Sequence, residues 1–194
     1  MSTHWNVKFL TSAASAGALV ADHGREVAFA GRSNAGKSTA INAITARSGL
    51  ARVSRTPGRT QLINFFEVAP ERRLVDLPGY GYAKVPEAVR ERWLELMRHY
   101  FDRRESLVGL VLIVDSRRGL GAQDVAMLEW VLARGRGALV LLSKADKLNR
   151  RDQSQVLRET RSACEGTPVV VQLFSAHDKL GIDEARAVMN GWLA

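Results

Sequence analysis

Gly31-Arg32-Ser33-Asn34-Ala35-Gly36-Lys37-Ser38 is the stretch that decides the fold, because two glycines followed by Lys and Ser form the pattern of a phosphate-binding loop. Glu26-Val27-Ala28-Phe29-Ala30 before it predicts a short buried strand, and residues 39–44 after it have helical spacing. Glycines allow backbone turns in which successive N–H groups converge on phosphate oxygens at a helix N-terminus. The order of strand, glycine loop and helix therefore predicts a site for nucleotide phosphates.

Each residue at the end of this loop has an expected role. Lys37 is expected to reach the β- and γ-phosphates, and the Ser38 hydroxyl is expected to ligate Mg²⁺. Thr39 follows in the first turn of the predicted helix and is included in the nucleotide site.

Length and composition indicate one globular domain. The chain has 194 residues, of which 46% are hydrophobic and 25% charged, enough for one well-formed core. We expect an irregular N-terminal segment over residues 1–25, with a short helix or strand between residues 9 and 23, and a nucleotide-binding domain over residues 26–194. No apolar run approaches the roughly 20 residues of a membrane span, and the N-terminus lacks the pattern of a signal peptide. With Cys164 as the single cysteine, we expect a cytoplasmic protein.

Predicted strands and helices alternate along the chain. Near-continuous apolar runs, such as residues 108–114 and 138–142, are typical of parallel strands covered on both faces. Residues 61–68 and 72–75 predict an antiparallel hairpin, because only three residues separate them. The pattern predicts a three-layer α/β fold with a six-stranded, mostly parallel sheet and one antiparallel edge hairpin. The expected strands are 26–30, 61–68, 72–75, 108–114, 138–142 and 169–174, and the expected longer helices are 86–104, 122–134, 151–165 and 182–193.

Asp76-Leu77-Pro78-Gly79 follows the second hairpin strand. An acidic residue at a strand end can hold Mg²⁺, and the Gly79 N–H can bind a γ-phosphate. This tetrapeptide is weak evidence alone, but after a phosphate loop it indicates a sensor of the γ-phosphate.

Ser143-Lys144-Ala145-Asp146 follows the strand over residues 138–142 and resembles the Asn/Thr-Lys-x-Asp sequence of GTP-binding domains. Guanine presents two adjacent N–H donors, and one carboxylate, here Asp146, accepts both, whereas adenine lacks these donors. Lys144 is expected to lie along the purine plane, and Ser143 keeps a hydroxyl at the first position. Phe174-Ser175-Ala176, at the end of the last strand, is expected to complete the guanine site.

Hydrolysis needs further groups, which the sequence supplies only by position. Thr60 ends a basic loop and could add its hydroxyl to Mg²⁺ when a γ-phosphate is bound. Tyr80 stands where Ras-type domains have a water-orienting Gln, so we expect slow intrinsic turnover. Asn34 resembles the Asn of GTPases that bind K⁺ beside the phosphates, although a loop-stabilising Asn is an equal alternative. The expected catalytic residues are Asn34, Lys37, Thr60 and Gly79.

The formal charge of +8 is uneven along the chain. Residues 47–104 contain 12 Lys and Arg and 7 Asp and Glu, so 12 − 7 = +5 of it lies there. This pattern fits either a solvated face or a surface for a polyanion, most plausibly RNA. The arginines without an acidic residue among them are Arg47, Arg52, Arg55 and Arg59.

The chain resembles the EngB (YihA/YsxC) family of bacterial ribosome-assembly GTPases, within the TrmE-Era-EngA-EngB-Septin-like group of P-loop GTPases. Residues 26–38 and 56–66 and the segment Asp76-Leu77-Pro78-Gly79-Tyr80-Gly81-Tyr82-Ala83 carry this resemblance. It implies a Ras-like domain that binds GTP or GDP with Mg²⁺, and it places Gly58, Arg59 and Thr60 at the nucleotide. It also implies a monomer that acts on the precursor of the large ribosomal subunit, through rRNA and ribosomal proteins, with a link to growth and division and with no DNA partner. One alternative is a GTPase that acts on a protein or membrane partner. The other alternative is a metabolic P-loop kinase or ATPase.

Overall fold

The computed structural model describes residues 5–51, 62–81 and 87–194, without the side chains of residues 88–90. The helices are α1 (Lys37–Ile44), α2 (Glu87–Arg103), α3 (Ala122–Leu132), α4 (Arg150–Ala163) and α5 (Ile182–Leu193), with 3-10 turns at Ala16–Ala18 and Ala145–Lys147. The strands are β1 (Lys8–Ala13), β2 (Arg25–Gly31), β3 (Ile63–Ala69), β4 (Arg72–Asp76), β5 (Leu107–Asp115), β6 (Gly137–Ser143) and β7 (Val169–Leu173).

The strands form one sheet in the order β1-β3-β4-β2-β5-β6-β7. The hairpin of β3 and β4 is antiparallel as expected, and the pairs β4–β2, β2–β5, β5–β6 and β6–β7 are parallel. The mostly parallel α/β prediction is confirmed, but the sheet has seven strands where six were expected. The additional strand is β1, which pairs antiparallel with β3 and lies inside the segment expected to be irregular.

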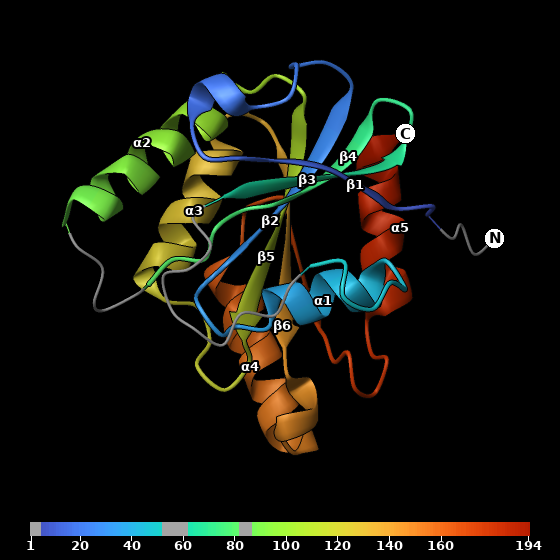
Figure 1. Cartoon of the computed structure of the whole chain (residues 1–194). Helices are drawn as coiled ribbons and strands as arrows, with labels where there is room; N and C mark the ends of the chain where they lie inside the picture. Colours follow the sequence, from blue (N-terminus) through green and yellow to red (C-terminus); the bar gives the residue numbers. More distant parts are fainter. Residues whose placement is uncertain (1–4, 52–61, 82–86) are drawn as a thin grey trace.

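Helices cover both faces of the sheet (Figure 1). α1 and α5 pack on one face and α2, α3 and α4 on the other. Both faces of the sheet are apolar, because alternate residues of a strand point to opposite faces. In β2, Val27 and Phe29 belong to the core under α1 and α5, and Ala28 and Ala30 belong to the other core. No helix of the described residues is long and apolar enough to cross a membrane.

Two glycines let α5 approach the sheet closely. A Cβ on Gly109 of β5 would lie 2.3 Å from the Trp192 ring, and a Cβ on Gly137 of β6 would lie 2.5 Å from it. The indole of Trp192 therefore occupies the space that two side chains would fill.

A buried ionic cluster lies near the amino end of β2. The Glu26 carboxylate is fully buried, accepts hydrogen bonds from Arg73 (2.7 Å) and Arg104 (2.6 and 2.9 Å), and accepts a further bond from the Tyr100 hydroxyl at 3.1 Å. Arg104 also donates to the carbonyl of Val20. This cluster fixes the N-terminal segment to the end of the sheet opposite the predicted nucleotide site.

Candidate functional site

The predicted nucleotide residues gather at the carboxyl edge of the parallel strands, where the loops after β2, β4, β6 and β7 meet (Figure 1). The phosphate loop crosses this edge from β2 to α1. A Cβ on Gly31 would lie 2.7 Å from the carbonyl oxygen of Ile113, so this position has no room for a side chain. Gly36 has a φ of 98° and is the N-cap of α1, a conformation that favours glycine. The two glycines are thus required for different reasons.

The charged groups of the phosphate loop and of the Asp76 turn lie together. The ammonium group of Lys37 forms an ion pair with the buried carboxylate of Asp76. Ser38 follows Lys37 in the first turn of α1. A hydroxyl and a carboxylate are hard oxygen donors of the kind that Mg²⁺ takes beside phosphates and water. Ser38 and Asp76 therefore fit a magnesium ion.

The turn after β4 lies directly against the phosphate loop. Leu77 donates its N–H to Phe29 O at 3.0 Å, and its side chain belongs to the core. Pro78 is also buried. A Cβ on Gly79 would lie 3.5 Å from both Gly31 O and Ser33 N. Leu77 and Pro78 therefore position Gly79 rather than offering side chains to a ligand.

The loop after β6 braces the phosphate loop. The Ser143 hydroxyl donates to Ala35 O at 2.5 Å and lies 3.1 Å from Val114 O. Lys144 has a φ of 58°, and its ammonium donates to Asn34 O at 2.6 Å. Serine thus supplies a hydroxyl that joins this loop to the phosphate loop.

Asp146 is held as an oriented carboxylate. Lys147 lies 3.0 Å from one oxygen, and the Ser175 hydroxyl donates to the other at 2.8 Å. The hydrogen bond from Lys147, followed by that from Ser175, lowers the pKa of Asp146 below its ordinary value against the opposing effect of burial. Ala145 donates its N–H to Phe174 O at 3.1 Å, and both side chains are buried, so they shape the loop. Asp146 is therefore an ionised hydrogen-bond acceptor at the end of the loop after β6.

Ala176 is half-buried after Ser175, and the two residues that follow are exposed. His177 Nδ1 lies 2.7 Å from a carboxylate oxygen of Asp178. The Asp178 N–H donates to the Ser175 hydroxyl at 3.1 Å, so this turn helps to hold Ser175 in place.

Asp115 is a site residue that the sequence reasoning missed. It ends β5, and its carboxylate accepts hydrogen bonds from Lys144 (2.9 Å) and Arg117 (2.7 and 2.9 Å). Burial favours a raised pKa for Asp115, but the bonds from Arg117 and Lys144 outweigh it, and the pKa lies well below its ordinary value. Asp115 therefore fixes the Lys144 ammonium. An acidic residue directly after an apolar strand was the signal available in the sequence.

The Tyr80 side chain points into the core. It is 5% exposed, and its hydroxyl donates to Asp124 at 2.5 Å. A phenol held in this way is not available to orient a water molecule, and slow intrinsic turnover stays a prediction. The Arg32 guanidinium lies beside Gly81 and Gly121, with Nε 3.1 Å from a Cβ built on Gly81 and Nη1 3.5 Å from one built on Gly121.

Five of the predicted residues lie outside the described residues: Arg52, Arg55, Gly58, Arg59 and Thr60. Arg47 is described; it is exposed and donates to Asn6 at 3.3 Å. Asn34 is exposed with a φ of 63°, and Ser33 and Thr39 flank the loop turn at its surface.

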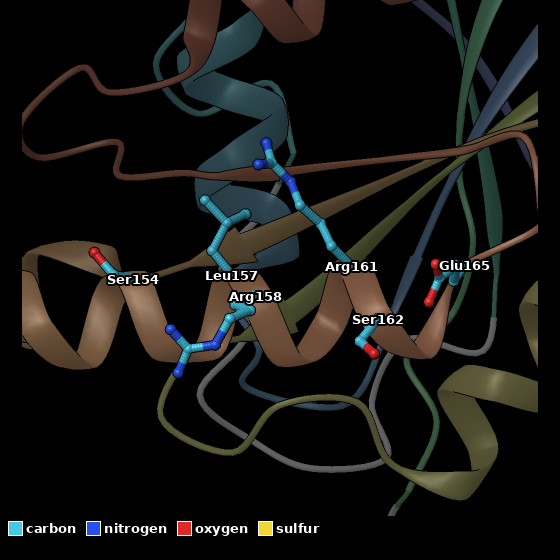
Figure 2. Close-up of a pocket in the computed structure, with 6 residues that line it drawn as sticks. All are labelled: Ser154, Leu157, Arg158, Arg161, Ser162 and Glu165. Carbon is cyan, nitrogen blue, oxygen red and sulfur yellow. The ribbon is translucent and has the colours of Figure 1, made fainter.

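A groove of about 500 Å³ runs along α4, outside this site. Figure 2 shows that the side chains lining it come from α4 and from the turn that follows this helix. They are Ser154, Leu157, Arg158, Arg161, Ser162 and Glu165. None of the predicted nucleotide residues lines it.

A protein-family comparison matches residues 26–144 to a model described as 50S ribosome-binding GTPase. A probable GTP-binding protein EngB of Stenotrophomonas maltophilia is 53% identical over 178 residues, which cover 90% of this chain and 89% of the relative. A protein of the same description from Coxiella burnetii is 49% identical over 187 residues, covering 95% of this chain and 91% of the relative.

Solved structures share the fold. A probable GTP-binding protein engB superposes with a TM-score of 0.66 at 24% identity, covering 87% of this chain and 98% of the other. Era, in a complex with MgGDPNP and nucleotides 1506–1542 of 16S ribosomal RNA, superposes with a TM-score of 0.66 at 16% identity, covering 90% of this chain and 58% of Era.

Proposed function

The chain belongs to the EngB family of GTP-binding proteins and is a GTPase, and from this premise we propose that it acts in the assembly of the large ribosomal subunit. In this role it binds the subunit precursor in one nucleotide state and leaves it in another. The proposal includes a monomeric protein of the cytoplasm, whose activity supports growth and division.

The oriented carboxylate of Asp146, held by Ser175 and Lys147, is the observation that carries the guanine part of the proposal. A carboxylate has two acceptor oxygens, which matches the two adjacent donors of guanine. Lys144, fixed by Asp115 and Asn34 O, provides the alkyl surface for the purine plane.

The phosphate part rests on the loop from Gly31 to Ser38. Its N–H groups lie at the N-terminus of α1, where the helix dipole favours anions. Lys37 binds the β- and γ-phosphates, and Gly79 donates its N–H to the γ-phosphate. Ser38 and Asp76 would hold Mg²⁺, with Thr60 added in the GTP state. When bound, the ion neutralises charge on the phosphate oxygens.

The description of the matching family and the charge of the chain support a ribosomal partner. RNA is a polyanion, and a protein of formal charge +8 is attracted to it over distances of about a Debye length. The arginines at 47, 52, 55 and 59 are proposed to contact rRNA phosphates in the GTP state.

The test is sedimentation of the protein with purified large-subunit precursors in a GTP analogue, in GDP and without nucleotide. We expect binding to be strongest with the GTP analogue. Vesicles that contain anionic lipids form the control, since they also attract a basic protein. Binding to the vesicles alone, or equal binding to particles in all three states, would contradict the ribosomal proposal and leave the GTPase activity standing.

A further inference from the structure

Three segments far apart in the sequence meet around the side chain of Tyr80. They are the phosphate loop at Arg32 and Ser33, the turn of Gly79 to Gly81, and the N-terminus of α3 at Gly121 to Asp124. The Tyr80 ring also lies against Trp93 of α2, with centroids 6.5 Å apart. Tyr80 directly follows Gly79, the residue expected to sense the γ-phosphate.

The backbone of Tyr80 is joined to the phosphate loop by two hydrogen bonds. The Tyr80 N–H donates to Gly31 O at 3.3 Å, and Tyr80 O accepts the Ser33 N–H at 2.9 Å. Arg32 and Tyr80 thus form a parallel bridge that extends the pairing of β2 with β4 beyond the strands. Gly79 is held between this bridge and the end of β4.

The side chain of Tyr80 adds an anchor outside the phosphate loop. Its hydroxyl donates to one oxygen of Asp124 at 2.5 Å, and the other oxygen of Asp124 accepts the Gly121 N–H at 2.8 Å. Asp124 is 1% exposed and lies in the first turn of α3, so the helix fixes its position. Burial, followed by the bond to Asp124, raises the pKa of Tyr80 far above its ordinary value, which keeps the phenol protonated as a donor.

We propose that Asp124 is a positioning residue for GTP binding: through the Tyr80 phenol it holds Gly79 ready for the γ-phosphate. Neither residue touches the nucleotide. GDP lacks the γ-phosphate, so its binding does not use the Gly79 N–H. A free turn at residues 79–81 must become ordered only when GTP binds, and the anchor removes this entropy cost beforehand.

The test compares two tyrosines that lose the same atom. Tyr80→Phe removes the hydroxyl bonded to Asp124 and keeps the ring against Trp93. Tyr100→Phe removes an equally buried hydroxyl bonded to Glu26, near the amino end of β2. Both variants lose one buried hydrogen bond to a carboxylate, so both are expected to unfold at a lower temperature.

The readout is the ratio of the Kd values for a non-hydrolysable GTP analogue and for GDP, both measured with Mg²⁺. Tyr80→Phe should weaken the analogue by about tenfold, as the loss of a hydrogen bond to a charged group allows. The Kd for GDP should change by less than about twofold, because GDP has no γ-phosphate for Gly79 to bind. A change of equal size in both Kd values would be uniform binding and would cancel in the ratio. Tyr100→Phe should leave the ratio unchanged.

A double-mutant cycle separates positioning from general stability. Asp124→Ala should raise the same ratio, and Tyr80→Phe combined with Asp124→Ala should raise it no further, because both changes break the same bond between Tyr80 and Asp124. Asp124→Asn retains an oxygen acceptor and should therefore raise the ratio less than Asp124→Ala does. The proposal would be overturned if the ratio were unchanged in Tyr80→Phe, if it rose equally in Tyr100→Phe, or if the increases in the cycle were fully additive. These outcomes concern the nucleotide cycle alone and are independent of the ribosomal partner.

Discussion

At the scale of single residues, Lys144 and Asp146 are two positions apart but have different partners. The ammonium of Lys144 reaches back to Asn34 O and Asp115, whereas Asp146 binds Ser175 and Lys147. The left-handed conformation of Lys144 turns the chain sharply between them. This turn lets one short loop brace the phosphate loop and hold the carboxylate that is proposed to bind the base.

Asp146→Ala should remove the preference for guanine. Two hydrogen bonds to a charged group are lost, at about 1.5–3 kcal/mol each, so the binding free energy of GDP and of GTP should become less favourable by several kcal/mol. Displacement of a fluorescent GDP by GTP and ATP measures this. Asp183→Ala, which removes an exposed carboxylate on α5, is the control and should bind as the unmodified protein does. Equal displacement by ATP and GTP in the unmodified protein would contradict the assignment.

A second prediction at this scale concerns Asn34. Its exposed position in the loop and the absence of a catalytic Gln at position 80 favour a role for K⁺, whose charge would stabilise the transition state. The GTPase rate should be higher in K⁺ than in Na⁺ at equal ionic strength. Asn34→Ala should abolish the difference, and Tyr80→Ala should affect it less.

Identical rates in the two salts, with and without ribosomal particles, would show that Asn34 only stabilises the loop. The catalytic group would then have to come from the partner.

At the scale of elements, the contact of α5 with β5 and β6 depends on residues without side chains. The Trp192 indole lies over Gly109 and Gly137, and a Cβ at either position would come within 2.6 Å of it. The periodicity of α5 predicts which of its faces is buried, but it does not show that two glycines on other elements make room for the ring.

Gly109→Ala should lower the free energy of unfolding by about 1–3 kcal/mol, because the indole must move. Gly191→Ala, next to Trp192 in α5, is the matched control. No atom lies within 4 Å of a Cβ built on Gly191, so alanine there should stabilise the helix by up to about 1 kcal/mol. Urea unfolding of the three proteins measures both effects. Destabilisation of the same size in both variants would contradict this account of the contact.

At the scale of the whole molecule, the predicted nucleotide loops and the buried ionic cluster lie at opposite ends of the strands. The nucleotide loops lie at the carboxyl edge of the sheet, and the Glu26 cluster with Arg73 and Arg104 lies near the amino end of β2. The buried cluster holds the N-terminal segment, including the carbonyl of Val20, at the edge opposite the predicted nucleotide loops.

The charge of the molecule leads to a prediction about its partner. If rRNA phosphates are bound, particle binding should fall steeply with salt, because each contact releases counterions. Arg52→Glu with Arg55→Glu should weaken particle binding and leave GDP affinity unchanged. Arg151→Glu with Arg158→Glu makes the same change in net charge on exposed positions of α4 and should have a smaller effect. Sedimentation over a range of salt concentrations tests this.

Particle binding that is insensitive both to salt and to the substitutions at 52 and 55 would indicate that the basic loop is only a solvated face. An equal loss with the α4 variant would assign the effect to net charge rather than to this loop.

The sequence by itself determined the α/β class, the place of the phosphate loop between β2 and α1, and the positions of Asp76, Lys144 and Asp146, because these depend on short-range spacing and on apolar runs. The sequence left a short helix or strand open in the N-terminal segment and did not place β1 in the sheet. Three of the six residues of β1 are exposed at the sheet edge, which leaves no apolar run, and only pairing with β3 makes it a strand.

Only the tertiary structure decided which side chains support the site. The Ser143 hydroxyl reaches Ala35, 108 positions away, and the Tyr80 phenol reaches Asp124, 44 positions away. Periodicity reports whether a side chain is buried, but it carries no information on which distant polar group completes its hydrogen bond. Those partners are set by the order of the strands and by the packing of the helices over them.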